Sequence, residues 1–251
     1  MFDLKNKVAV VTGSTRGIGK AVARAYAQAG AQVVISSRKA DACKEVVREF
    51  KDAGLSAIDI PCHVGRKDQL QTLVDETGRA LGPIDILVCN AATNPVYGPM
   101  HQVSDDAFDT VINTNLRSVF QLCNMVCPQM AERKTGSVII VSSIAGIRGD
   151  AVIGTYGISK AAETALVRNL AIEWGPSGVR ANAIAPGLVK TDFARALWED
   201  PEQLKAVQAV TPLRRIGQPE EIAGVALFLA SQASSFVTGH TLVADGGMTI
   251  S

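Results

Sequence analysis

Short apolar runs alternate with longer segments of helical periodicity along nearly the whole chain. The first run, Val8-Ala9-Val10-Val11, is apolar at every position, which is typical of a strand buried on both faces of a parallel sheet. The runs that predict strands cover residues 8–11, 32–36, 56–60, 62–64, 84–89, 137–141, 180–184 and 241–243. The segments that predict helices cover residues 20–29, 40–53, 67–80, 105–132, 154–174 and 220–229, whereas residues 186–219 are less regular.

This alternation predicts one α/β domain that spans residues 1–251. Strands separated by helices favour a doubly wound parallel sheet of about seven strands, with helices on both faces and right-handed crossovers. A chain of 251 residues allows one large domain or two small ones. We expect one domain, because no linker, internal repeat or low-complexity segment divides the sequence.

Charge and composition exclude several classes of function. The formal net charge is +1 and both signs are scattered along the chain, so neither a nucleic-acid surface nor a membrane surface is indicated. The sequence has no apolar run of about 18 residues, no apolar signal core and no peroxisomal tail. The five cysteines lack zinc-site spacing. We therefore expect a reduced, cytoplasmic protein without a metal, acting on a small molecule.

A glycine-rich turn follows the first predicted strand and opens the first predicted helix. Gly13 permits a tight turn, Gly17 lets the backbone approach a pyrophosphate, and Gly19 lets the helix pack closely on the sheet. The helix N-terminus then offers N–H groups and a positive dipole end to phosphates. A P-loop is disfavoured, because Gly19-Lys20 is followed by Ala21. The turn predicts a Rossmann-type dinucleotide site formed by Gly13, Thr15, Arg16, Gly17, Ile18 and Gly19.

The end of the second predicted strand indicates which dinucleotide binds. An NAD site places a carboxylate about 20 positions after the glycines, to bind the ribose 2′-hydroxyl. Here the sequence is Ser36-Ser37-Arg38-Lys39, with no acidic residue before Asp41. Arg38 can pair with a 2′-phosphate, assisted by Ser37 and, from the glycine turn, by Arg16. We therefore favour NADP(H) over NAD(H), the alternative being exposed basic residues without that role.

A second candidate site is the pair Tyr156 and Lys160. Positions i and i+4 lie on the same face of a helix, which puts a phenol beside an ammonium. An unperturbed tyrosine titrates near ~10, so bringing its pKa to neutrality requires about 4 kcal/mol of stabilisation of the phenolate. A neighbouring cation in a partly dry site supplies energy of that order. Taken alone, the spacing also fits a packed tyrosine with a solvated lysine.

Three separated patterns resemble the short-chain dehydrogenase/reductase family: Thr12-Gly13-x-x-x-Gly17-x-Gly19, Asn90-Ala91-Ala92, and Ser143 with Tyr156-x-x-x-Lys160. The resemblance extends over essentially the whole chain. It implies that Tyr156 is the acid/base of an oxidoreductase, and that Lys160 lowers the pKa of this tyrosine and holds the nicotinamide ribose. It further implies that Ser143 binds the substrate oxygen and that Asn115 holds a water in a proton relay, unless Asn115 is merely solvated.

Further cofactor residues follow from the same resemblance. Asn90 corresponds to the asparagine that braces the central strands, and Thr191 to a partner of the nicotinamide carboxamide. His63 departs from the family pattern, which often has Asp at this position; it either contacts adenine or simply ends a strand. The remaining cofactor residues expected from these segments are Val64, Ala91, Pro186, Gly187 and Val189.

The segment 188–215 is expected to cover the substrate, because ligands of open α/β sheets lie beyond the carboxyl ends of the strands. Phe193, Leu197 and Trp198 recur at roughly helical spacing and would give an apolar lid, unless they pack on the body of the protein or on a neighbouring subunit. With Ala145, they predict a pocket for a hydrophobic ketone or aldehyde. The segment resembles a branch of NADPH-dependent carbonyl and retinal reductases, whose members form homotetramers.

Two alternatives remain open. A 3-oxoacyl-acyl-carrier-protein reductase of the same fold would need a basic surface near the pocket, for which Arg117, Arg148 and Arg168 are candidates. A non-catalytic NADP-binding regulator would be marked by loss of a catalytic residue, and all four are present.

Overall fold

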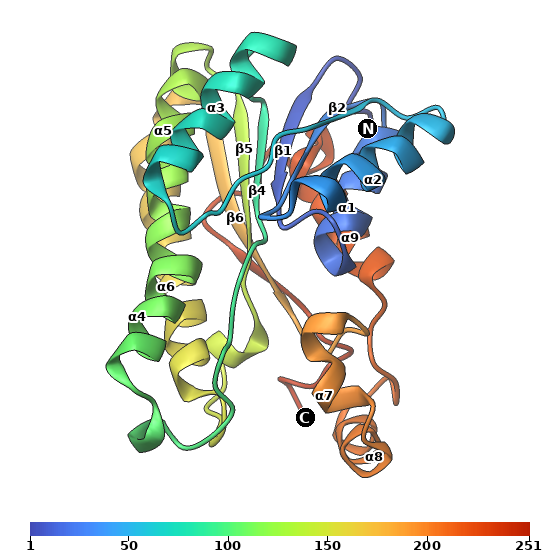
Figure 1. Cartoon of the computed structure of the whole chain (residues 1–251), viewed down its shortest axis with the longest axis vertical. Helices are drawn as coiled ribbons and strands as arrows, with labels where there is room; N and C mark the ends of the chain where they lie inside the picture. The colour runs from blue at the N-terminus through green and yellow to red at the C-terminus, as the bar shows by residue number, and fades with distance from the viewer.

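The protein is described by a computed structural model that covers residues 1–251, in which seven parallel strands form one sheet (Figure 1). The strands are β1 Val8–Thr12, β2 Gln32–Ser36, β3 Ala57–Asp59, β4 Ile86–Cys89, β5 Gly136–Val141, β6 Val179–Pro186 and β7 Thr241–Ala244. Their order is β3-β2-β1-β4-β5-β6-β7, so the direction of winding reverses between β1 and β4. The predicted doubly wound parallel sheet is confirmed, and the reversal is where such sheets open a crevice for a ligand.

Helices cover both faces of the sheet. Figure 1 shows α1 Gly17–Gln28, α2 Ala40–Asp52 and α9 Pro219–Ala230 on one side, and α3 Lys67–Leu81, α5 Ser118–Glu132 and α6 Gly154–Trp174 on the other. Each face has its own apolar core, because every residue of β1 and β4 is buried and successive side chains point to opposite faces. None of the helices combines the length and apolar character needed to cross a membrane.

Three short helices project beyond the sheet, at the lower end of the molecule in Figure 1: α4 Asp105–Ile112, α7 Arg195–Trp198 and α8 Pro201–Val210. The last two lie in the stretch 186–219, where the sequence predicted no helix bounds and only the roughly helical spacing of Phe193, Leu197 and Trp198. The start of α8 nevertheless carries a local signal. The Oδ1 atom of Asp200 accepts hydrogen bonds from the N–H groups of Glu202 and Gln203, and Pro201 occupies the first turn.

Two other predictions need correction. The helix expected over 105–132 is interrupted by a π-helical turn, Asn113–Arg117, which separates α4 from α5. Residues 62–64 are not a strand, although Cys62 and Val64 are buried as their apolar character predicted. The remaining predicted strands and helices match elements of the structure, with differences of a few residues at their ends.

Candidate active site

A cleft of about 590 Å³ runs along the carboxyl ends of the strands. It is lined by the glycine turn, by the segments that follow β2, β4, β5 and β6, and by α7 and α8. The predicted cofactor and catalytic residues that line it are Gly13, Arg16, Gly17, Ile18, Gly19, Ser37, Arg38, His63, Val64, Asn90, Ala91, Ser143, Tyr156, Lys160, Pro186, Gly187, Val189 and Thr191. Thr15 does not line the cleft, because the turn directs its neighbours Gly13, Arg16 and Gly17 there instead.

The glycine turn has the backbone that a phosphate site requires. Gly13 and Gly17 have φ values of 67° and 54°, in the left-handed region that favours glycine. A Cβ atom on Gly19 would overlap the carbonyl oxygen of Gly13 and would lie 2.5 Å from Nδ2 of Asn90. Helix α1 begins here without a side-chain cap and without an acidic residue in its first turn. Its first N–H groups are therefore available to an anion.

Asn90 ties the ends of the two central strands together. Its Nδ2 donates to the carbonyl oxygens of Thr12 (2.9 Å) and Gly13 (3.2 Å). The hydroxyl of Thr12 in turn accepts hydrogen bonds from the backbone N–H groups of Asn90 (3.0 Å) and Ala91 (3.1 Å). These four bonds fix the floor of the cleft at the point where the sheet reverses its winding, which is the bracing role expected of Asn90.

Basic side chains lie at the rim beyond β2. Arg38 and Arg16 are exposed and line the cleft, and no carboxylate ends β2. A guanidinium of Arg16 also lies 3.6 Å from the carboxylate of Asp192, which links the glycine turn to the segment after β6. His63 lines the same region, and its Nδ1 accepts a hydrogen bond from the N–H of Gly65 (3.2 Å).

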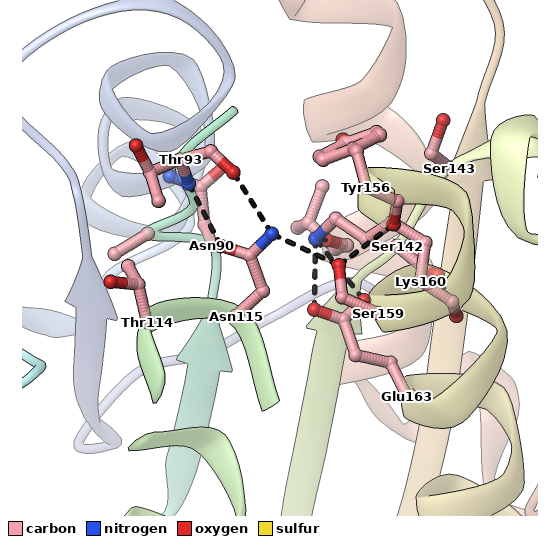
Figure 2. Close-up of polar contacts among 12 residues, drawn as sticks. Asn90, Thr93, Thr114, Asn115, Ser142, Ser143, Tyr156, Ser159, Lys160 and Glu163 are labelled. Atoms are coloured by element: carbon pink, nitrogen blue, oxygen red, sulfur yellow. Dashed lines mark hydrogen bonds and ion pairs between the residues drawn. The ribbon is translucent and has the colours of Figure 1, made fainter. Parts of the chain in front are cut away.

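Tyr156 and Lys160 lie one turn apart at the start of α6, as their spacing predicted, and Ser143 lies beside Tyr156 in the same cleft (Figure 2). The Nζ atom of Lys160 is 5.5 Å from the centre of the Tyr156 ring. Helix α6 approaches the segment after β5 closely, since a Cβ atom on Gly157 would lie 2.7 Å from the carbonyl oxygen of Ala145. This close approach keeps the phenol next to the Ser143 hydroxyl.

The pKa of Tyr156 moves in the direction opposite to the prediction. Burial raises it above its ordinary value; the Lys160 ammonium lowers it, the Glu163 carboxylate raises it again, and a hydrogen bond with Ser143 lowers it. Lys160 therefore acts as predicted, but burial and Glu163 outweigh it. The predicted shift toward neutrality is wrong for this arrangement of side chains, because burial, which has the largest effect, raises the pKa of the phenol and the nearby Glu163 carboxylate adds to that effect.

Asn115 lies in the π-helical turn and is fully buried. Its Nδ2 donates to the carbonyl oxygen of Thr93 (3.0 Å) and to the hydroxyl of Ser159 (3.0 Å), and its Oδ1 accepts from the N–H of Thr93 (2.8 Å) (Figure 2). The alternative that Asn115 is solvated is wrong. Its amide lies behind the cleft wall and joins the loop after β4 to α6, and π-helical turns recur at such functional positions.

At the other end of the cleft, Ala145, Phe193 and Leu197 line the wall, as expected. The centre of the Phe193 ring lies 6.0 Å from the centre of the Tyr156 ring. Trp198 does not line the cleft, because its Nε1 donates to the carbonyl oxygen of Thr191 (2.8 Å) and its ring packs under Lys190. Apolar or aromatic lining residues that the sequence pattern did not single out include Tyr97, Ile153 and Met248, and also Val207 within the expected segment 188–215.

Sequence reasoning also missed Glu163, which lies three positions after Lys160 on α6 and is 1% exposed. Its Oε1 and Oε2 atoms lie 2.8 and 3.1 Å from Nζ of Lys160 (Figure 2). Burial raises the pKa of Glu163 to about 7, although the Lys160 ammonium lowers it. The signal was present in the sequence, since i and i+3 share a helix face.

Comparison with known proteins agrees with this geometry. The family described as enoyl-(acyl carrier protein) reductase matches residues 13–249. Dehydrogenase/reductase SDR family member 4 of Bos taurus is 44% identical over 244 residues, which cover 97% of this chain and 88% of that protein. A gluconate 5-dehydrogenase from Burkholderia cenocepacia, solved with NADP and tartrate, superposes with a TM-score of 0.96 at 35% identity, covering 100% of this chain and 98% of that one.

A second solved structure differs from the first in the ligand it holds. This 7α-hydroxysteroid dehydrogenase, in complex with NADH and 7-oxo glycochenodeoxycholic acid, superposes with a TM-score of 0.94 at 37% identity. The alignment covers 98% of this chain and 95% of that one. Two relatives of the same fold thus hold ligands of very different size, tartrate in one and a 7-oxo bile acid in the other.

Proposed function

The chain belongs to the short-chain dehydrogenase/reductase family, and from this premise we propose that it is an NADP(H)-dependent oxidoreductase that interconverts a hydrophobic ketone or aldehyde and the corresponding alcohol. One observation carries the proposal. The phenol of Tyr156, the hydroxyl of Ser143 and the ammonium of Lys160 line one cleft, between a phosphate-binding glycine turn and an apolar wall. A proton donor, an oxygen-binding group and a cation are what this protein must contribute to carbonyl reduction.

The cofactor end suits NADP(H). The left-handed glycines and the uncapped start of α1 suit a pyrophosphate, and a Cβ atom at Gly19 would close this cradle. Arg38 and Arg16, with Ser37, are the groups that would pair with a 2′-phosphate. NADP was bound in the gluconate 5-dehydrogenase relative. When bound, the nicotinamide ring supplies a hydride in reduction and accepts one in oxidation.

The acid/base role falls to Tyr156. In reduction its hydroxyl donates a proton to the carbonyl oxygen, which leaves a phenolate; in oxidation the phenolate takes the proton from the alcohol. Ser143 donates a hydrogen bond to the same oxygen and orients it. Lys160 stabilises the phenolate through its charge, and Asn115 fixes the loop and helix that carry these groups.

The wall at the end of the cleft away from the glycine turn favours an apolar substrate. Phe193, Leu197 and Val207 come from the segment after β6, and Ile153 and Met248 complete the wall. The bile-acid ketone bound by the 7α-hydroxysteroid dehydrogenase shows that this fold has room for a ligand of that kind. The segment 188–215 is proposed to cover the substrate during turnover.

Acyl-carrier-protein substrates are the second candidate, because the description of the matching family names them. Of the three arginines considered for docking an acidic carrier, only Arg148 lines the cleft, and it donates to the carbonyl oxygen of Met248 (3.0 Å). A single arginine that already hydrogen-bonds within the chain is a small basic surface for docking an acidic carrier protein, so this candidate ranks second. We also carry forward the homotetramer and the cytoplasmic location as proposals from family resemblance, which light scattering and cell fractionation would test.

The test is a cofactor titration followed by a substrate panel. We expect NADPH to bind more tightly than NADH, and apolar ketones and aldehydes to be reduced faster than an acetoacetyl thioester or a sugar acid. Preference for the thioester would select the second candidate. Binding of NADPH with no turnover of any carbonyl would overturn the oxidoreductase proposal in favour of a regulator.

A further inference from the structure

Glu163 is a buried carboxylate beside the reacting groups that the proposed mechanism does not use. It lies on the face of α6 turned toward the sheet and is 1% exposed, and the lysine that it contacts is 2% exposed. Removing two charges from water costs several kcal/mol per ion before their attraction offsets it. A charge pair used only to hold a helix in place would be replaced by apolar side chains at little cost. The position of Glu163 beside Lys160 therefore calls for a chemical reason.

Glu163 occupies most of the hydrogen-bonding capacity of Lys160. An ammonium has three N–H donors and no acceptor. Nζ of Lys160 donates to the carbonyl oxygen of Val141 (2.9 Å) and to Oε1 (2.8 Å) and Oε2 (3.1 Å) of Glu163. All three donors are thus directed at acceptors that are neither Tyr156 nor a ligand in the cleft. Any further bond from Nζ requires that one of these three be released.

The charge of Glu163 also opposes the effect of Lys160 on the phenol. The ammonium favours the phenolate form of Tyr156, and the carboxylate disfavours it. Burial by itself disfavours the ammonium, but Glu163 and Tyr156 reverse this, so that the pKa of Lys160 lies above its ordinary value. The cation therefore stays charged while its influence on Tyr156 is partly cancelled.

Few other ionisable groups surround this pair. Tyr156 comes from α6 itself, Cys89 acts on Lys160 from the end of β4, and Tyr97 acts on Tyr156 from the segment after β4. The carbonyl of Val141 comes from the last residue of β5, and the hydroxyl of Ser142, which acts on Glu163, comes from the residue after it. The π-helical turn contributes only the neutral amide of Asn115. Glu163 is therefore the one carboxylate among the groups that act on the Lys160–Tyr156 pair.

We propose that Glu163 is a positioning residue that competes with Tyr156 for the charge and the N–H donors of Lys160, so that the protonation state of this carboxyl governs how readily Tyr156 exchanges its proton. The inference rests on the proposed role of Tyr156 as acid/base. While Glu163 is a carboxylate, Lys160 is held toward it and Tyr156 keeps its proton, which suits proton donation to a carbonyl. When Glu163 is protonated, Lys160 is released toward Tyr156 and the phenolate becomes easier to form, which suits oxidation of an alcohol.

The test is Glu163→Gln, which keeps the shape and an acceptor for Lys160 but removes the charge. In wild type, kcat/KM for alcohol oxidation should rise with pH. In Glu163→Gln we expect the midpoint of this rise to lie about one pH unit lower, so that kcat/KM at a pH below the wild-type midpoint is about tenfold higher. The high-pH fall in carbonyl reduction should move in the same direction. Glu163→Asp, which restores a carboxylate, should return both limbs toward wild type. Glu173→Gln makes the same chemical change at an exposed position of α6 and should leave both limbs unchanged.

A second measurement separates this inference from the proposed function. The titration of Tyr156 is read without turnover from the ultraviolet difference between each protein and its Tyr156→Phe counterpart. A lower midpoint in Glu163→Gln supports the proposal even if no carbonyl is reduced, in which case only the proposed function fails. An unchanged or higher midpoint overturns the proposal. If Glu163→Gln does not fold, the carboxyl band of Glu163 is followed in wild type by infrared spectroscopy as the pH is raised. A band that does not change when Tyr156 ionises also overturns the proposal.

Discussion

The two ends of the cleft are built by different means. At the cofactor end the backbone forms the site, through the left-handed turns at Gly13 and Gly17 and the hydrogen bonds from Asn90 to the end of β1. At the substrate end side chains form it, and neither α7 nor α8 contains a fully buried residue. Segments with few buried contacts open most easily and tolerate sequence change. This difference accounts for relatives of one fold that hold a nicotinamide dinucleotide in both cases, but tartrate in one and 7-oxo glycochenodeoxycholic acid in the other.

Tyr156 stands between the two ends, so replacing it separates binding from chemistry and has the largest expected effect. Tyr156→Phe removes only the hydroxyl, and loss of a general acid lowers the rate by roughly 10² to 10⁴. NADPH affinity should stay within about twofold of wild type, since the glycine turn is untouched. Steady-state kinetics and a fluorescence titration with NADPH measure the two effects. Tyr26→Phe, which removes a hydroxyl that donates to the carbonyl oxygen of Ala226 and does not line the cleft, is the control. Full activity in Tyr156→Phe would remove the acid/base assignment.

The backbone character of the cofactor end is tested by Gly19→Ala. The added methyl group would overlap the Gly13 carbonyl oxygen and crowd Nδ2 of Asn90, so either α1 or the strand end must shift. We expect NADPH affinity to fall by a factor of about 10 to 100 and unfolding free energy to fall by about 1–3 kcal/mol. Thermal denaturation and NADPH titration measure both.

Gly78→Ala is the matched control, because Gly78 lies within α3 and a Cβ atom there meets nothing within 4 Å. It should stabilise the protein by about 0.5–1 kcal/mol through helix propensity. If both variants behaved alike, the close approach at Gly19 would not be what shapes the cofactor end.

The preference for NADPH over NADH is expected to depend on Arg38 more than on the glycine turn. Arg38→Ala should raise the KM for NADPH by a factor of about 10, the order of one hydrogen bond to a charged group, and should leave the KM for NADH unchanged. Lys39→Ala removes the adjacent exposed cation and serves as the control. Equal changes for NADPH and NADH in Arg38→Ala would exclude contact with the 2′-phosphate.

The parts of the molecule that the backbone builds are the parts that the sequence predicted well. The sheet, most helices and the glycine turn follow from local requirements, since a buried parallel strand needs β-branched apolar residues and a left-handed turn needs glycine. Asn90, Ser143, Tyr156 and Lys160 were found because their spacing matches a family pattern, and the cleft contains them all. The π-helical turn at Asn115 could not be predicted from periodicity, because one extra residue rotates the apolar face by about 100° while the segments on either side keep the same helical period.

What the sequence did not predict depends on contacts between distant segments. Tyr97, Ile153, Val207 and Met248 meet at the substrate end from four parts of the chain, and no local signal links them. Trp198 was misplaced because helical spacing gives a face but not the competing hydrogen bond to Thr191. The pKa of Tyr156 was misjudged because its direction depends on burial and on Glu163 together, which only the packed structure reveals.

The smallest expected effect belongs to the substrate end. Leu197 lines the cleft and is half-buried, so Leu197→Ala removes about 1 kcal/mol of apolar contact with a hydrophobic substrate. The KM for an apolar ketone should rise about fivefold, while NADPH affinity stays unchanged. Val210→Ala, at an exposed position at the end of α8 that does not line the cleft, should change neither. A tenfold or larger loss of NADPH affinity in Leu197→Ala would mean that the substrate segment supports the cofactor end, and that the two ends are one structural unit rather than a fixed half and a variable half.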